Sequence, residues 1–77
     1  MIFPNKLISF SESILAKSIN ILLVVEDTNM SISELYLATS RYFEDISEFL
    51  LAMDILYLLG KIKFDENTQV IEYVKSN

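Results

Sequence analysis

The stretch DISEFLLAMDILYLLG, residues 45–60, decides the fold of this chain. It opens with Asp45 followed three residues later by Glu48, a pair typical of helix starts. It ends at Gly60, the only glycine, and the apolar run in between is broken mainly by Asp54. A helix that is apolar on nearly every side is normally buried in a core. The run is also shorter than the roughly 20 apolar residues that span a bilayer. We therefore expect a small soluble domain built around this helix.

Two further helices are predicted before this one. The sequences SFSE at 9–12 and SISE at 31–34 both match the capping box. In this motif a serine and a glutamate three residues later each bond the other's backbone and so start a helix. The first box predicts a helix over residues 10–25, and the second predicts a shorter helix that ends near Tyr42.

The residues before the first helix, 1–8, predict an extended N-terminal arm. Pro4 fixes its own φ and biases the residue before it away from the helical conformation. Ile2 and Phe3 are candidates to dock on another surface, and that surface belongs either to the same domain or to another chain.

After Gly60 the hydrophobic period changes from that of a helix to that of a strand. Residues 61–64 alternate polar and apolar, 65–68 form a polar turn, and 70–74 are rich in β-branched and aromatic residues. These segments predict a β-hairpin. The fold expected is mainly α (α+β), a single winged helix-turn-helix-like domain over residues 1–77, with three helices followed by a hairpin wing.

The amount of apolar material predicts a surface that binds a partner. Hydrophobic residues make up 52% of the 77 residues, whereas a domain of about 60 residues buries only about 60% of its unfolded surface. A contiguous exposed apolar patch marks a partner surface, although scattered surface leucines need no explanation. For Asp54, a place on the exposed stripe of its helix and a salt bridge to a partner chain both stay open. The candidate partner-binding residues are Ile2, Phe3, Leu7, Tyr36, Asp54, Tyr57 and Tyr73.

The charge pattern argues against a free-standing DNA reader. The formal net charge is −5, and the six basic residues are scattered along the chain. The third helix of a winged-helix DNA reader offers Arg, Lys, Asn or Gln to base edges, and residues 46–59 contain none of these. Lys61 and Lys63 on the hairpin could touch a phosphate, but a solvated strand face explains them as well. No base-specific reading is expected, and a homodimeric winged-helix transcriptional regulator that binds DNA stays as the alternative.

The residue types present predict no enzyme. The chain has no cysteine and no histidine, so thiolate nucleophiles, histidine general bases and the usual zinc sites are excluded. One glycine is too few for a glycine-rich phosphate-binding loop. We expect no catalytic residue, no cofactor and no metal. The N-terminus lacks the pattern of a signal peptide, which favours a cytoplasmic protein.

Two stretches resemble the middle component 6 proteins of ABC three-component systems. They are the opening, with FPNK at 3–6 and SESIL at 11–15, and the apolar helix at 49–62. This second stretch has the family's pattern of one aspartate, a closing glycine and a following strand. The resemblance spans nearly the whole chain.

The resemblance implies a small non-enzymatic subunit of a bacterial antiphage or conflict system. Such systems pair an SMC-like ABC ATPase with a middle component and an effector, often a nuclease. The chain would then be an adaptor that binds the ATPase subunit and links it to the effector subunit. No membrane partner is expected, and self-association into a homodimer stays open.

Overall fold

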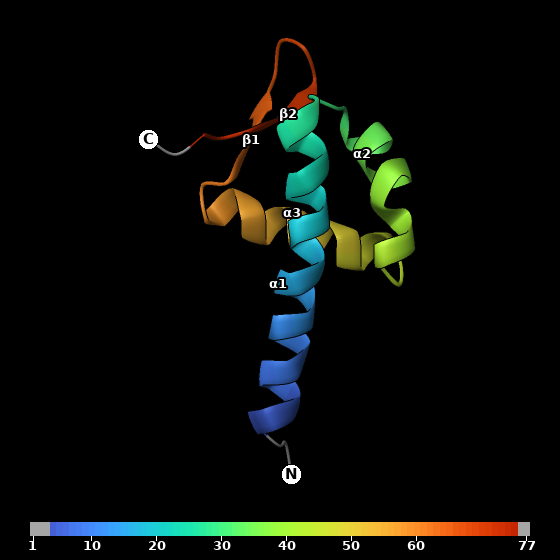
Figure 1. Cartoon of the computed structure of the whole chain (residues 1–77), viewed down its shortest axis with the longest axis vertical. Coiled ribbons are helices and arrows are strands. Elements are labelled where there is room, and N and C mark those ends of the chain that lie inside the picture. The colour runs from blue at the N-terminus through green and yellow to red at the C-terminus, as the bar shows by residue number, and fades with distance from the viewer. Residues whose placement is uncertain (1–3, 76–77) are drawn as a thin grey trace.

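The structure is a computed structural model that describes residues 4–75, with side chains described for residues 13–75. Three helices are followed by a two-stranded antiparallel hairpin (Figure 1). The elements are α1 (Pro4–Asp27), α2 (Ile32–Thr39), the 3-10 turn η1 (Ser40–Tyr42), α3 (Ile46–Leu58), β1 (Ile62–Asp65) and β2 (Val70–Tyr73). This order confirms the predicted mainly α (α+β), winged-helix-like fold.

The first helix is longer than the sequence predicts. An extended arm is expected over residues 1–8, whereas α1 begins at Pro4. Proline fits the first helical position, because the N–H that it lacks would have no partner within the helix there. The arm prediction is therefore wrong for residues 4–8. Ile2 and Phe3 lie outside the described residues.

The starts of α2 and α3 follow their sequence signals. The Ser31 hydroxyl accepts the Glu34 N–H at 3.1 Å, and the Glu34 carboxylate accepts the Ser31 N–H at 3.0 Å. This confirms the second capping box. The Asp45 carboxylate accepts the Glu48 N–H at 2.9 Å and caps α3. Each bond satisfies a backbone donor that the first turn of a helix leaves free.

The end of α3 is set by Gly60, which has a left-handed φ of 72°. Its N–H donates to the Tyr57 carbonyl at 3.0 Å, and the N–H of Lys61 donates to the Leu56 carbonyl at 2.9 Å. These two bonds are those of the Schellman motif. They terminate the helix and turn the chain toward β1.

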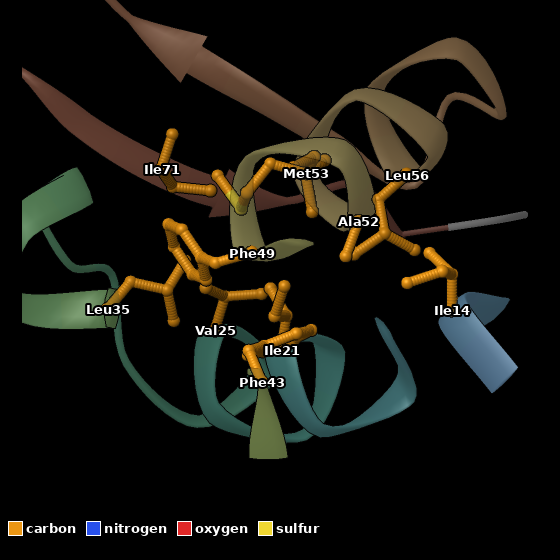
Figure 2. Close-up of a cluster of buried hydrophobic side chains, with 11 residues drawn as sticks. Ile14, Ile21, Val25, Leu35, Phe43, Phe49, Ala52, Met53, Leu56 and Ile71 are labelled. Atoms are coloured by element: carbon orange, nitrogen blue, oxygen red, sulfur yellow. The ribbon is translucent and has the colours of Figure 1, made fainter. Parts of the chain in front are cut away.

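Helix α1 runs across α3 (Figure 1). The core lies where these two helices cross, and residues of α2 and the hairpin pack into it as well (Figure 2). Phe49 of α3 is fully buried. Its ring lies edge-on to those of Tyr36 and Phe43, with ring centroids 5.0 and 5.6 Å apart. The buried apolar residues are Ile14, Ile21, Val25, Leu35, Phe43, Phe49, Ala52, Met53, Leu56, Ile62 and Ile71.

A short backbone bridge fastens the hairpin to the segment between α1 and α2. The N–H of Met30 donates to the Ile71 carbonyl at 3.4 Å, and the N–H of Ile71 donates to the Met30 carbonyl at 2.6 Å. Ile71 also pairs with Phe64 of β1. Strand β2 therefore lies between β1 and Met30, which fixes the hairpin against the helices.

The N-terminal part of α1 extends beyond the other elements (Figure 1). The Cα radius of gyration is 13.2 Å and the principal extents are 47 × 29 × 19 Å. A compact domain of this length would have a radius of gyration of about 11.5 Å. The difference reflects the projecting helix, and the packed body is built on the second half of α1.

Candidate functional site

The outward face of α3 is apolar. One side of the helix is buried through four residues, which are Phe49, Ala52, Met53 and Leu56. The helix also has seven exposed residues, and the five that follow its first turn are Leu50, Leu51, Asp54, Tyr57 and Leu58. Residues three and four apart lie on one face of a helix, so these five form one continuous surface, here called the outward face of α3. Tyr57 is 63% and Leu58 82% exposed. The face thus presents aliphatic and aromatic area around a single carboxylate.

A groove of about 170 Å³ lies beside this face, between α3 and the hairpin. Its lining combines three buried residues with six exposed ones. The buried residues are Met53, Ile62 and Ile71, and the exposed ones are Ile32, Leu50, Asp54, Tyr57, Lys63 and Phe64. Sites for small-molecule ligands measure about 300–1,000 Å³, whereas a cavity of about 150 Å³ holds one benzene-sized group. The α3–hairpin groove therefore suits one large apolar side chain better than a cofactor.

The groove is lined by two charged residues, Asp54 and Lys63, and only Lys63 forms an ion pair among the side chains that the structure describes. Among the residues whose side chains are described, the ion pairs are Lys17–Glu48 and Lys63–Glu72. The second pair places the Lys63 Nζ atom 3.4 Å from the Glu72 Oε1 atom. The carboxylate of Asp54 lies in the middle of the outward face of α3 and is exposed to solvent. It is thus available to a cation that another molecule supplies.

A wider hollow of about 650 Å³ lies at the start of α3, where α1 passes it. Lys17 of α1 and Glu48 of α3 form a salt bridge there, with 2.5 Å between Nζ and Oε1. The same Glu48 oxygen accepts the N–H of Glu44 at 3.1 Å, and Asp45 caps the helix. The Lys17–Glu48 salt bridge therefore ties α1 to α3, and the hydrogen bonds of Glu48 and Asp45 fix the start of α3.

Acid is expected to weaken the fold through Glu48 and Asp65. The hydrogen bond from the Lys17 ammonium holds the pKa of the Glu48 carboxyl below its ordinary value of 4.5. The backbone N–H groups of Asn67 and Thr68 hold the pKa of Asp65 below 3.8. A carboxyl with a lowered folded-state pKa stabilises the fold above its ordinary pKa, and that contribution is lost as the pH falls through the folded-state pKa. Urea unfolding from neutral pH down through these values measures the loss.

The variant Glu48→Gln isolates the Glu48 contribution. It is expected to be less stable than the wild type at about pH 7, and the difference is expected to close at a pH below the folded-state pKa of Glu48, because the carboxyl is then protonated in both states of the wild type. A stability gap of the same size at both pH values would contradict this assignment.

The structure brings together two of the predicted partner-binding residues. Asp54 and Tyr57 lie on neighbouring turns of α3 and line the same groove. Tyr36 and Tyr73 are half-buried, and both pack against the core. Leu7 lies in α1, but its side chain is outside the described residues. Asp54 and Tyr57 are therefore the predicted residues on which the candidate site is built.

The sequence predicts two of the nine groove residues, Asp54 and Tyr57. The exposed apolar residues that it misses are Ile32, Leu50 and Phe64. On a helix that is apolar all round, the exposed face is decided by which neighbours cover it, and the sequence of the helix alone does not contain that information. The available signal is the spacing of Leu50, Asp54 and Tyr57, which stand at i, i+4 and i+7 and share one face.

The described part of the chain offers an apolar binding surface. It contains no cluster of three or more acidic side chains arranged to hold a metal ion. Every buried side-chain nitrogen or oxygen within it has a hydrogen-bond partner. None of its helices combines the length and the apolar character needed to cross a membrane. The outward face of α3 and the groove beside it supply apolar area, a small cavity and one negative charge.

The fold and this surface define a small helical domain suited to binding another protein. A family model described as ABC-three component (ABC-3C) system Middle Component 7 matches residues 3–71. The chain therefore belongs to this family of middle components. The predicted class, a middle component of an ABC three-component system, is confirmed, and within the class the family is component 7 and not component 6. No curated protein and no solved structure matches the chain.

Proposed function

We propose that this chain is a non-catalytic adaptor that binds the SMC-like ABC ATPase of its system and links it to an effector such as a nuclease. Membership in a middle-component family supports this proposal, because the chain then works beside other subunits. In this proposal the ATP chemistry and any nuclease chemistry belong to those subunits. The biological setting proposed is defence against phage or a similar genetic conflict.

The outward face of α3 is the observation that carries the proposal. An exposed surface of this kind, with Leu50, Leu51, Tyr57 and Leu58 around one aspartate, is typical of protein interaction sites. Aromatic side chains near the centre of an interface frequently supply most of its binding energy. We therefore assign Asp54 and Tyr57 to partner binding.

The same face weighs against the alternative function, a homodimeric regulator that binds DNA. The helix that would enter the major groove presents leucine, tyrosine and aspartate where basic and amide side chains read bases. Asp54 would also lie close to the phosphates and repel them. Binding of a DNA duplex tighter than about 1 µM at physiological salt would favour the alternative, since non-specific binding falls between about 10⁻⁴ and 10⁻⁶ M.

Size-exclusion chromatography with light scattering tests the adaptor proposal directly. The chain is co-expressed with the ATPase subunit of its own system and purified through a tag on the ATPase. We expect both to elute together in a defined stoichiometry at micromolar concentration, and we expect added effector subunit to join the peak. Separate elution of the chain and the ATPase at that concentration would overturn the proposal.

A further inference from the structure

We propose that the α3–hairpin groove binds an amphipathic helix of the ATPase subunit, which sets an arginine or lysine against Asp54 and one large apolar side chain in the groove. This inference rests on the adaptor function proposed above and adds where the partner binds and what chemistry it brings. It is argued in turn from the shape of the groove, the charge of Asp54 and the exclusion of a second copy of this chain.

The shape of the groove favours a protruding side chain. With about 170 Å³ between α3 and the hairpin, the groove holds one aromatic or branched aliphatic group. Tyr57 and Phe64 stand exposed on its two sides, 63% and 39% accessible, and Ile71 is among the buried residues that line it. Such a site takes a single anchor residue and leaves the rest of the partner on the surrounding surface.

The spacing of the exposed residues favours a helix as the partner segment. Leu50, Asp54 and Tyr57 extend over two turns of α3, which is about 10 Å along its axis. A second helix that lies along this face brings anchors at i, i+3 or i+4 and i+7 into contact with them, as in other complexes in which a helix lies in a groove.

Charge complementarity decides the character of that helix. Asp54 forms no ion pair in the described part of the chain, whereas Lys63, which lines the same groove, pairs with Glu72. The whole chain carries a net charge of −5. A partner helix with a basic residue among its apolar ones neutralises Asp54 as the interface excludes water. A neutral helix would leave that carboxylate desolvated and unpaired, which carries a free-energy cost.

The same charge argues against a second copy of this chain as the occupant. Two-fold symmetry about the outward face of α3 sets this face against the same face of the second copy, and residues near its middle, such as Asp54, lie near the symmetry axis and face their own counterparts. The two Asp54 carboxylates would then approach each other in a surface that is losing its water. A homodimer through this face is therefore disfavoured by like-charge repulsion.

The test measures binding of the full chain to the purified ATPase subunit by titration calorimetry. Asp54→Lys is expected to weaken binding by about thirtyfold or more, because the reversal leaves the partner's charge buried without its counter-ion. Asp54→Glu keeps the charge and is expected to retain binding. Glu26→Lys, a charge reversal at an exposed site on α1 outside the groove, serves as the matched control and is expected to leave binding unchanged. Circular dichroism verifies that each variant is folded.

A photo-crosslinking residue in place of Tyr57 identifies the occupant. We expect the crosslinked peptide to come from a helix of the ATPase that carries an arginine or lysine, and reversal of that basic residue to glutamate is expected to restore binding to Asp54→Lys. A crosslink to a second copy of the chain would overturn the inference. Equal affinity of the wild type and Asp54→Lys for the ATPase subunit would also overturn it, and in that case the adaptor function stands. Absence of any wild-type complex would overturn both.

Discussion

Phe49→Ala is expected to lower the free energy of unfolding by about 3–5 kcal/mol. Phe49 has no exposed surface and lies edge-on to the rings of Tyr36 and Phe43. The substitution removes the whole ring and leaves a cavity that the surrounding helices fill only in part. A domain of 77 residues has a total stability of about 4–12 kcal/mol at the usual value per residue. Urea unfolding followed by circular dichroism measures the loss, and a largely unfolded variant is within the expected range.

Tyr57→Ala is the control for this prediction. It removes an aromatic ring from the same helix at a position that is 63% exposed. We expect a change in the free energy of unfolding of about 0.5 kcal/mol or less, as is usual for surface substitutions. If Phe49→Ala cost no more than Tyr57→Ala, the assignment of Phe49 to the centre of the core would be wrong.

Ile21→Ala is expected to lower the free energy of unfolding by about 2–5 kcal/mol. Ile21 is fully buried and belongs to the stripe of α1 that includes Ile14 and Val25. This stripe forms the α1 side of the core (Figure 2). Since α1 contributes few buried residues to the core, the loss of one large side chain removes a large share of the packing between α1 and α3. Thermal unfolding gives the same ranking, because 1 kcal/mol shifts Tm by about 4–8 °C in a domain of this size.

The comparison variant is Ile19→Ala, two residues away on the same helix. Ile19 is 53% exposed, and both substitutions bring the same gain in helix propensity from isoleucine to alanine. The difference between the two variants therefore reports burial alone. Equal effects at Ile19 and Ile21 would show that α1 does not turn Ile21 toward the core and Ile19 toward solvent.

The parts of the fold that depend on local chemistry are readable from the sequence. Ser31, Asp45 and Gly60 each act through hydrogen bonds or dihedral angles within a few residues, and each sets a helix end as predicted. The helix start predicted from the capping box at Ser9 is wrong, although the box has the same pattern as the one at Ser31. A capping box marks a helix start only where the preceding residues do not continue the helix. Here Pro4 occupies a first helical position and the helix runs through Ser9.

The candidate site is less predictable, because it depends on packing between elements distant in sequence. Asp54 and Tyr57 could be placed on one helix face by spacing, and they do line one groove. Tyr36 and Tyr73 carry the same side chain as Tyr57, but the core covers a large part of both. The contribution of Phe64 depends on how the hairpin folds back toward α3.

The family assignment shows a similar limit. The resemblance carried by the opening and by the apolar helix with its aspartate and terminal glycine predicts the class, a middle component of an ABC three-component system, and the family model confirms that class. The resemblance does not separate component 6 from component 7, whose model matches residues 3–71. Short apolar helices share their pattern because they meet the same packing demand.

The backbone bridge between Met30 and Ile71 has a consequence for how the chain assembles. It joins residues far apart in sequence, and closing a loop of that length costs about 3 kcal/mol of chain entropy. Its two hydrogen bonds contribute about 0.5–1.5 kcal/mol each, so they offset this cost in full only at the upper end of that range. The remainder comes from burying the side chain of Ile71, which is 3% exposed. We therefore expect the bridge to form together with the core, so that the hairpin joins the helices as they pack.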